Sequence, residues 1–165
     1  GFSFSTLERI GGTPCILLGV AAVKRTSKRD AVLRAIIGDN FRRALMAFPD
    51  EDVLLGTRMS NAGALEGFKL LTDIVPRPDH KASGEERAWG RRLAKRFGVD
   101  ADRYDDQTFV VTGDGGPPLV LDHESLKPES IDADVAAQFS GLDAARGDCV
   151  VTCGWVMAEE LLKHG

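Results

Sequence analysis

The sequence predicts an α/β (or α+β) fold, a three-layer sandwich in which helices cover a mixed sheet of about 4–5 strands. Two observations lead to this prediction. Short apolar runs typical of buried strands alternate with longer stretches whose apolar residues recur at helical spacing. The chain also has 165 residues, of which 43% are hydrophobic and 28% charged, so we expect residues 1–165 to form a single globular domain.

The N-terminal part is expected to begin with a lead-in segment at residues 1–14, in which Ser5–Ile10 form a short helical turn. The apolar run Cys15–Val23 then predicts a buried strand, with a short core helix as the alternative. A helix near 30–48 follows, because its apolar residues share one face and Ser27-Lys28-Arg29-Asp30 resembles a capping box.

The middle of the chain predicts one strand and two helices. Asp52–Gly56 is a short strand, and a linker leads from it to a helix near 62–75. A further helix near 84–97 begins at a capping box, Ser83-Gly84-Glu85-Glu86, in which the serine and the last glutamate satisfy each other's backbone amides.

A central β-hairpin is expected near 108–122. Its strands, Thr108–Thr112 and Leu119–Asp122, flank a loop of glycines and prolines, which is a typical hairpin signal. Both strands carry consecutive apolar residues, so both of their faces are expected to be covered.

The C-terminal part predicts a helix near 131–140 and leaves the last segment, 148–163, open between two structures. Either Cys149–Cys153 form a strand before a helix near 155–163, or Asp148 caps one long helix.

Acidic residues and a histidine flank the predicted hairpin. Pairing of its strands would bring Asp105 and Asp106 close to Asp122, His123 and Glu124, an oxygen-rich group that suits a divalent cation such as Mg²⁺ or Mn²⁺. These five residues are the candidate metal ligands, and Asp106 and His123 are also candidate catalytic residues. The alternative is that acidic residues flank the strands because they are solvated.

A glycine-containing turn after the strand at 52–56 is a second candidate site. It offers close backbone approach, hydroxyl groups, the Arg58 guanidinium and a helix N-terminus, which together suit an anion such as phosphate. The alternative is an ordinary strand-to-helix connection capped by Ser60 or Asn61. The candidate cofactor-binding residues are Gly56, Thr57, Ser60, Asn61 and Gly63.

Cys149 is a third candidate. If it opened a helix, its thiol would ionise more readily and act as a nucleophile, with His80 or His123 as the base. The alternative is a core cysteine. The chain has 3 cysteines, which is not a disulfide framework, so we expect a reducing compartment, the cytoplasm or an organelle interior.

Charge is unevenly distributed along the chain. Residues 1–49 hold 8 basic and 3 acidic residues, a net charge of +5, whereas residues 99–165 hold 4 and 14, a net charge of −10. This polarity favours a protein partner, and the acidic total of −4 argues against nucleic acid. The basic helix at 84–97 is a possible contact surface for an anionic partner. We find no apolar run long enough for a transmembrane helix and no secretory signal.

Two segments resemble β-1,3-galactosyltransferase-type catalytic domains. An apolar strand at Ile16-Leu17-Leu18-Gly19-Val20 precedes Lys28-Arg29-Asp30-Ala31-Val32-Leu33-Arg34, and Asp105-Asp106-Gln107-Thr108-Phe109-Val110 is similar to that family's acidic metal-binding motif before Phe-Val. The sequence departs from the pattern by one extra residue before Arg34 and by the lack of a third aspartate. The resemblance implies a metal-dependent transferase acting on a nucleotide-linked substrate.

Three functions are therefore open. The preferred hypothesis is a non-catalytic binding, accessory or assembly subunit that acts through protein–protein contacts, because no complete catalytic motif is present. The alternatives are a small divalent-metal-dependent enzyme acting on a phosphorylated or nucleotide-linked substrate, and a cysteine hydrolase. Apolar surface that the core does not need would favour the first, and a pocket joining the turn at 56–63 to the hairpin would favour the second.

Overall fold

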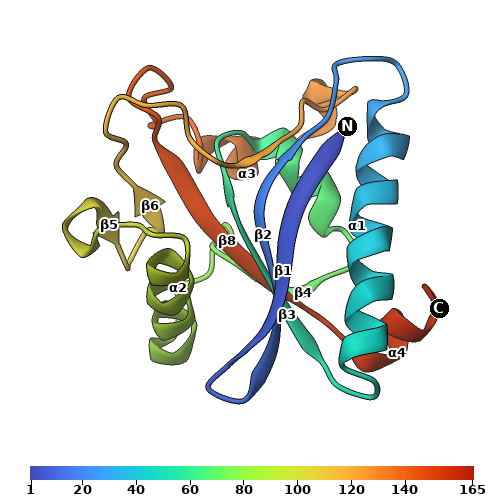
Figure 1. The fold of residues 1–165 in the computed structure, drawn as a ribbon. Coiled ribbons are helices and arrows are strands. Elements are labelled where there is room, and N and C mark those ends of the chain that lie inside the picture. The colour runs from blue at the N-terminus through green and yellow to red at the C-terminus, as the bar shows by residue number, and fades with distance from the viewer.

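The computed structural model describes all 165 residues, which form one mixed sheet with helices on both faces (Figure 1). The predicted fold class is confirmed, but the sheet has 8 strands, more than expected. Their order is β1-β2-β3-β8-β6-β5, with β4 paired to β8 and β7 paired to β2. The strands are β1 Phe2–Ile10, β2 Thr13–Ala22, β3 Val53–Met59, β4 Thr72–Val75, β5 Tyr104–Asp105, β6 Val110–Val111, β7 Leu121–Asp122 and β8 Cys149–Val156.

Four α-helices and three 3₁₀ helices accompany the sheet. The α-helices are α1 Arg29–Ala47, α2 Gly84–Arg96, α3 Ala133–Ala137 and α4 Ala158–Leu162, and the 3₁₀ helices are η1 Ala62–Phe68, η2 Ala101–Arg103 and η3 Pro128–Ser130. None of them combines the length and apolar character that a membrane crossing requires.

Two separate hydrophobic cores lie on the two faces of the sheet, which makes three layers. Alternate residues of β2 serve opposite cores, because successive side chains of a strand point to opposite faces. Ile16 and Leu18 join the core that also contains residues of α1, η1 and α4. Leu17 joins the other core, together with Leu93 of α2. Figure 1 shows α1 and α2 on opposite sides of the sheet.

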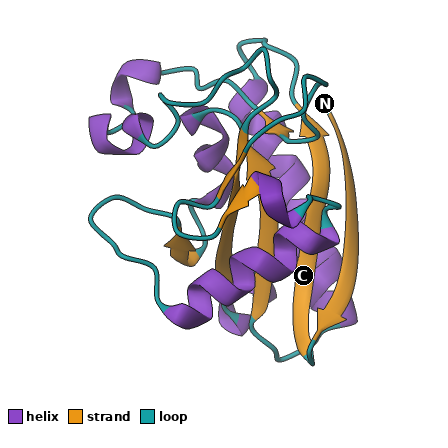
Figure 2. Cartoon of the chain, turned by 90° about the vertical axis from the view of Figure 1, so that its left-hand side faces the viewer, coloured by secondary structure: helices purple, strands orange, loops and turns teal.

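The N-terminal segment is a strand, and the predicted helical turn at 5–10 is wrong. β1 pairs antiparallel with β2 along its whole length, and Gly11 and Gly12 make the turn with φ of +58° and +86°. The pairing partner, which local sequence does not show, decides this conformation. β1 has no neighbour on its other side and is an edge strand, the outermost strand at N in Figure 2.

Local signals predicted the two long helices well. α1 and α2 match the helices expected near 30–48 and 84–97, and Ser83 and Glu86 form the predicted capping box. The other proposed box is wrong, because α1 begins after Lys28 and no side chain caps it. Asp30 contacts His123 instead.

Two predicted helices are shorter in the structure. The helix expected near 62–75 is divided into η1 and the strand β4, which pairs with β8. The helix expected near 131–140 is reduced to α3, five residues long. The last segment adopts the first of its two predicted alternatives, the strand β8 followed by α4.

The central hairpin predicted near 108–122 does not form. β6 pairs antiparallel with β5 and β8, whereas β7 pairs in parallel with β2, on a different part of the sheet. The loop between them is held by a distant side chain, because Gly113 donates its N–H to Asp148 at 2.8 Å. Long-range partners therefore replace the pairing that the local pattern suggested.

Candidate functional site

The structure separates the five predicted metal ligands into two groups. Asp106 accepts hydrogen bonds from Arg87 at 3.1 Å and Arg91 at 2.7 Å, and these guanidinium groups hold its pKa below the usual value. The neighbouring carboxylate of Asp105 accepts the backbone N–H of Gln107 at 2.9 Å. Both residues lie beside α2, away from the other three candidates, because the hairpin that would have joined them is absent.

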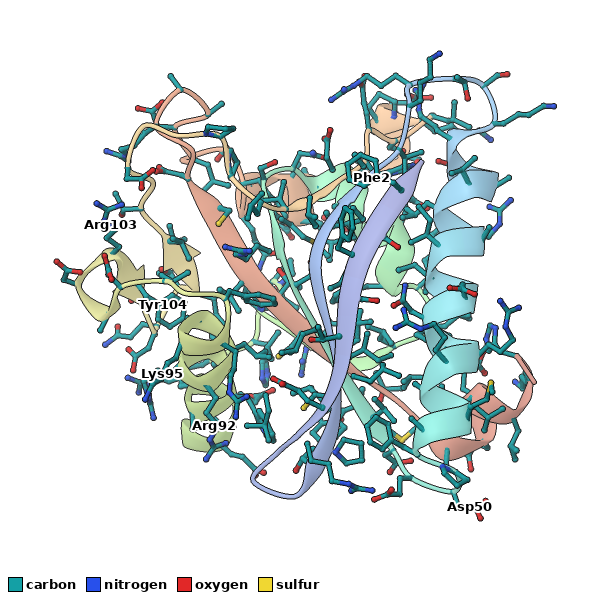
Figure 3. The ribbon with its side chains drawn as sticks, viewed as in Figure 1. Phe2, Asp50, Arg92, Lys95, Arg103 and Tyr104 are labelled. Atoms are coloured by element: carbon teal, nitrogen blue, oxygen red, sulfur yellow. The ribbon has the colours of Figure 1, made fainter.

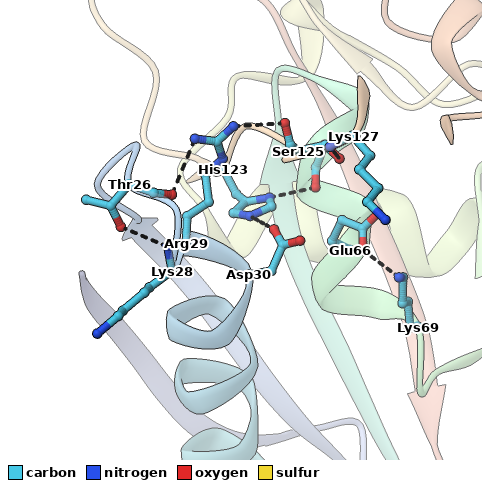
Figure 4. A network of polar contacts seen from close by, with 10 residues as sticks. Thr26, Lys28, Arg29, Asp30, Glu66, Lys69, His123, Ser125 and Lys127 are labelled. Carbon is cyan, nitrogen blue, oxygen red and sulfur yellow. Dashed lines mark hydrogen bonds and ion pairs between the residues drawn. The ribbon is translucent and has the colours of Figure 1, made fainter. Parts of the chain in front are cut away.

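The second group surrounds the start of α1 (Figure 4). His123 is fully buried, with Nδ1 2.9 Å from the carbonyl oxygen of Gly63 and Nε2 2.9 Å from Oδ1 of Asp30. Asp122 and Glu124 form ion pairs with Arg25 at 3.5 and 2.6 Å. No set of three or more His, Cys, Asp or Glu side chains is arranged to hold a metal ion. The expected gathering of all five at one end of a hairpin is therefore wrong.

The predicted anion-binding turn is mainly strand. Gly56 lies inside β3, where an added Cβ would approach Leu93 of α2 to 2.8 Å, so this glycine permits close packing of helix and sheet. Thr57 is buried and donates its hydroxyl to the carbonyl oxygen of Leu18 at 2.7 Å. A Cβ on Gly63 would lie 2.7 Å from the backbone nitrogen of Ser125. Gly56, Thr57 and Gly63 are therefore engaged in contacts within the protein.

Ser60 and Asn61 connect β3 to η1. Asn61 stands at the N-cap of η1 but its side chain accepts no capping hydrogen bond. The structure thus does not bring the five predicted cofactor-binding residues together around a single ligand position.

Cys149 lies on β8, opposite Val111 of β6, rather than at a helix N-terminus. Its thiol is buried, and burial raises its pKa to about 11. Burial likewise raises the pKa of Cys15 to about 11 and that of Cys153 to about 12. This environment is the opposite of the one that activates a nucleophilic cysteine.

We expect iodoacetamide at about pH 8 to alkylate the cysteines of the native chain at least roughly a hundredfold more slowly than those of the chain in urea. The reason is that a thiol pKa about two pH units higher leaves about a hundredth as much thiolate. Mass spectrometry of labelled peptides would give the rate for each of the three cysteines. Fast native labelling at Cys149 alone would contradict this environment and restore the nucleophile hypothesis.

The sequence predicted that Arg58 would lie in an anion-binding turn, but its surroundings in the structure are different. It lies on β3, and its guanidinium packs on the ring of Phe97, with Cζ 4.7 Å from the ring centroid. Nη2 lies 3.4 Å from the carbonyl oxygen of Gly19, whereas Nε is buried and has no hydrogen-bond partner. No carboxylate forms an ion pair with Arg58, and burial lowers its pKa.

Two cavities meet at Arg58. One of about 430 Å³ lies between β1 and the end of α2, and its lining residues are Phe4, Ser5, Thr6, Leu17, Gly19, Arg58, Arg96 and Phe97. The other, of about 220 Å³, lies beneath the loop at 112–119 and also includes Arg103, which Figure 3 labels. A signal for this site was available in the sequence, because an arginine next to a run of buried apolar residues is uncommon.

The outer edge of β1 adjoins the larger cavity. Phe2 and Phe4 of this strand are 52% and 68% exposed, and their rings make an edge-to-face contact at 6.0 Å between centroids. Figure 3 shows Phe2 at the start of β1, on the surface of the molecule. A backbone edge, two exposed aromatic rings and an unpaired guanidinium thus occur together.

The basic face of α2 is largely paired within the chain. Arg87 and Arg91 share Asp106, and Arg96 pairs with Glu8 of β1 at 2.9 Å. Lys95 lies on the side of the helix away from the sheet (Figure 3). Ion pairs therefore engage three of the five Lys and Arg residues of α2.

Comparison with models of known families, with curated proteins and with solved structures finds no match to this chain.

Proposed function

We propose that this chain is a non-catalytic binding or assembly subunit that acts through protein–protein contacts and receives an extended segment of its partner along β1. The observation that supports this proposal best is the free edge of β1, a strand of 9 residues hydrogen-bonded only to β2. Such an edge presents unpaired N–H and C=O groups, which a partner strand satisfies when it adds to the sheet.

The side chains of this edge favour binding rather than protection. Proteins usually guard a long edge strand with charged residues, prolines or a covering element. Residues 2–7 of β1, Phe-Ser-Phe-Ser-Thr-Leu, contain no charge and no proline. Phe2 and Phe4 are exposed on the same strand two positions apart, so they project on one face and supply an apolar contact for alternate side chains of the added strand.

The charges around this edge favour an acidic partner segment. Arg43 of α1 donates to the Ser5 hydroxyl at 3.0 Å, and Arg58 and Arg96 line the cavity on the other face of β1. The first 49 residues carry a net charge of +5. Acidic side chains on the incoming segment would therefore be attracted to both faces of the β1 edge.

A matched pair of variants tests the proposal. Phe4→Glu places a charge on the edge, and Met46→Glu places the same charge on α1, where the side chain is 79% exposed. Peptides selected from a random displayed library on the immobilised chain are expected to be acidic and extended. They should bind the Met46→Glu variant as they bind the wild type and bind the Phe4→Glu variant at least about tenfold more weakly, a loss of about 1.4 kcal/mol.

Sedimentation of the chain alone tests whether a second copy of the chain, rather than a different protein, binds along the edge of β1. A dimer that dissociates in Phe4→Glu but not in Met46→Glu would support an assembly subunit whose partner is a second copy. The proposal fails if the wild type is monomeric and every selected peptide binds the two variants equally.

A further inference from the structure

Arg58 lies beside α2 and has no acidic partner, unlike three other arginines near that helix. Arg87, Arg96 and Arg103 pair with Asp106, Glu8 and Asp114 at 3.1, 2.9 and 3.2 Å. Arg58 is partly buried, and only a carbonyl oxygen at 3.4 Å approaches its guanidinium. A partly buried charge without a counter-charge is unfavourable, so its environment is complete only when an anion is present.

The cavity beside β1 has room for such an anion and the right walls for it. Its volume of about 430 Å³ suits a small molecule. Two arginines line it and no carboxylate does, although Arg96 is already paired with Glu8. The smaller cavity on the other side of Arg58 is lined by Asp100 and Asp114, which would repel an anion.

Apolar and aromatic groups form the rest of the larger cavity. The Phe97 ring covers one side of the Arg58 guanidinium, Leu17 lies in the floor, and Phe4 is the exposed wall. Rings of this kind stack favourably on a flat apolar body, which a bare inorganic ion does not have.

We infer that this cavity binds a small aromatic anion, with a carboxylate or phosphate group on Arg58 and the ring against Phe4 and Phe97. A guanidinium presents two parallel N–H groups to such an oxyanion, and pairing in a partly buried position makes the contact stronger than at the surface. The inference goes beyond the proposed function: Phe4 and Arg58 contribute to both, but the ligand here is a small molecule in the cavity and needs no strand added to β1.

Four probes at constant ionic strength test it: acetate, benzoate, inorganic phosphate and phenyl phosphate. The matched variants are Arg58→Gln and Arg34→Gln, which removes an exposed arginine of α1. Benzoate or phenyl phosphate should raise the thermal midpoint of the wild type and of Arg34→Gln in a saturable way, and more strongly than the ion without the ring. The Arg58→Gln variant should not respond, and without ligand it should be at least as stable as the wild type.

An equal response of both variants, or no response of the wild type to any probe, would overturn the inference. Equal affinity for acetate and benzoate would overturn the role of the rings. If the Arg58→Gln variant does not fold, amide chemical shifts of the wild type decide: benzoate or phenyl phosphate must move Gly19, Arg58 and Phe97, and shifts confined to other regions would refute the site.

Discussion

Replacing His123 with leucine is expected to lower the free energy of unfolding by about 2–4 kcal/mol, because two hydrogen bonds are lost in a buried place. The imidazole is 0% exposed and contacts the carbonyl oxygen of Gly63 and the carboxylate of Asp30, both at 2.9 Å. Leucine has a similar volume, so little of the loss would come from a cavity. Urea denaturation followed by circular dichroism measures the change.

His80→Leu is the control for this substitution. His80 contacts Glu86 at 2.8 Å, but the pair lies at the surface, so its loss is expected to cost no more than about 1 kcal/mol. Because His123 joins the start of α1 to η1, its removal should also speed amide hydrogen exchange at both elements. Similar losses for the two histidine variants would contradict the structural role of His123.

Asp148→Asn is the second substitution with a large expected effect, a loss of about 2–4 kcal/mol at neutral pH. Asp148 is 3% exposed and accepts four hydrogen bonds: from the backbone of Gly113 and Asp143 at 2.8 and 2.9 Å, and from Arg146 at 2.8 and 2.7 Å. An amide keeps one oxygen and presents an N–H group to the other donors. The loops at 112–119 and 143–148 should therefore separate.

The effect of Asp148→Asn should depend on pH. The Arg146 guanidinium, followed by the two backbone N–H groups, holds the pKa of Asp148 well below its usual value, against the opposing effect of burial. The unfolded chain therefore takes up the proton first as the pH falls. Stability from the carboxylate is complete above about pH 4, the unfolded pKa, and is lost progressively below it.

Urea midpoints of the wild type and the Asp148→Asn variant, measured across acidic and neutral pH, would show this behaviour. The difference between them should be largest near neutral pH and should shrink below about pH 4, where protonation of Asp148 in the unfolded chain removes the contribution of the carboxylate to stability. A difference that stays constant over the same range would show that Asp148 acts through packing rather than through its charge.

Local signals in the sequence determined the elements that depend on neighbouring residues. The Ser83–Glu86 capping box specified the start of α2, and the apolar periodicity of 30–48 specified α1. The apolar run at 15–23 indicated the strand β2, with a short core helix as the alternative. In these cases the residues that stabilise the element lie within it or beside it. The fold class also followed, since the alternation of such elements is itself local information.

The candidate sites depend on contacts between distant residues, and the sequence did not specify these. Asp105 and Asp106 were expected to meet His123 across a hairpin, but β6 pairs with β8 and β7 with β2. The strands concerned have two residues each, so their own preferences are weak beside the hydrogen bonds and burial offered by long strands elsewhere in the sheet.

By itself, the sequence determined the main helices, the apolar strands and the α/β class of this protein. Only the tertiary structure decided that β1 is a free edge, that Arg58 lies unpaired between two cavities, and that His123 is a buried structural residue. The physical reason is that periodicity and capping act within a few residues. Strand partners, charge partners and burial are instead properties of chain segments that meet only when the whole sheet forms.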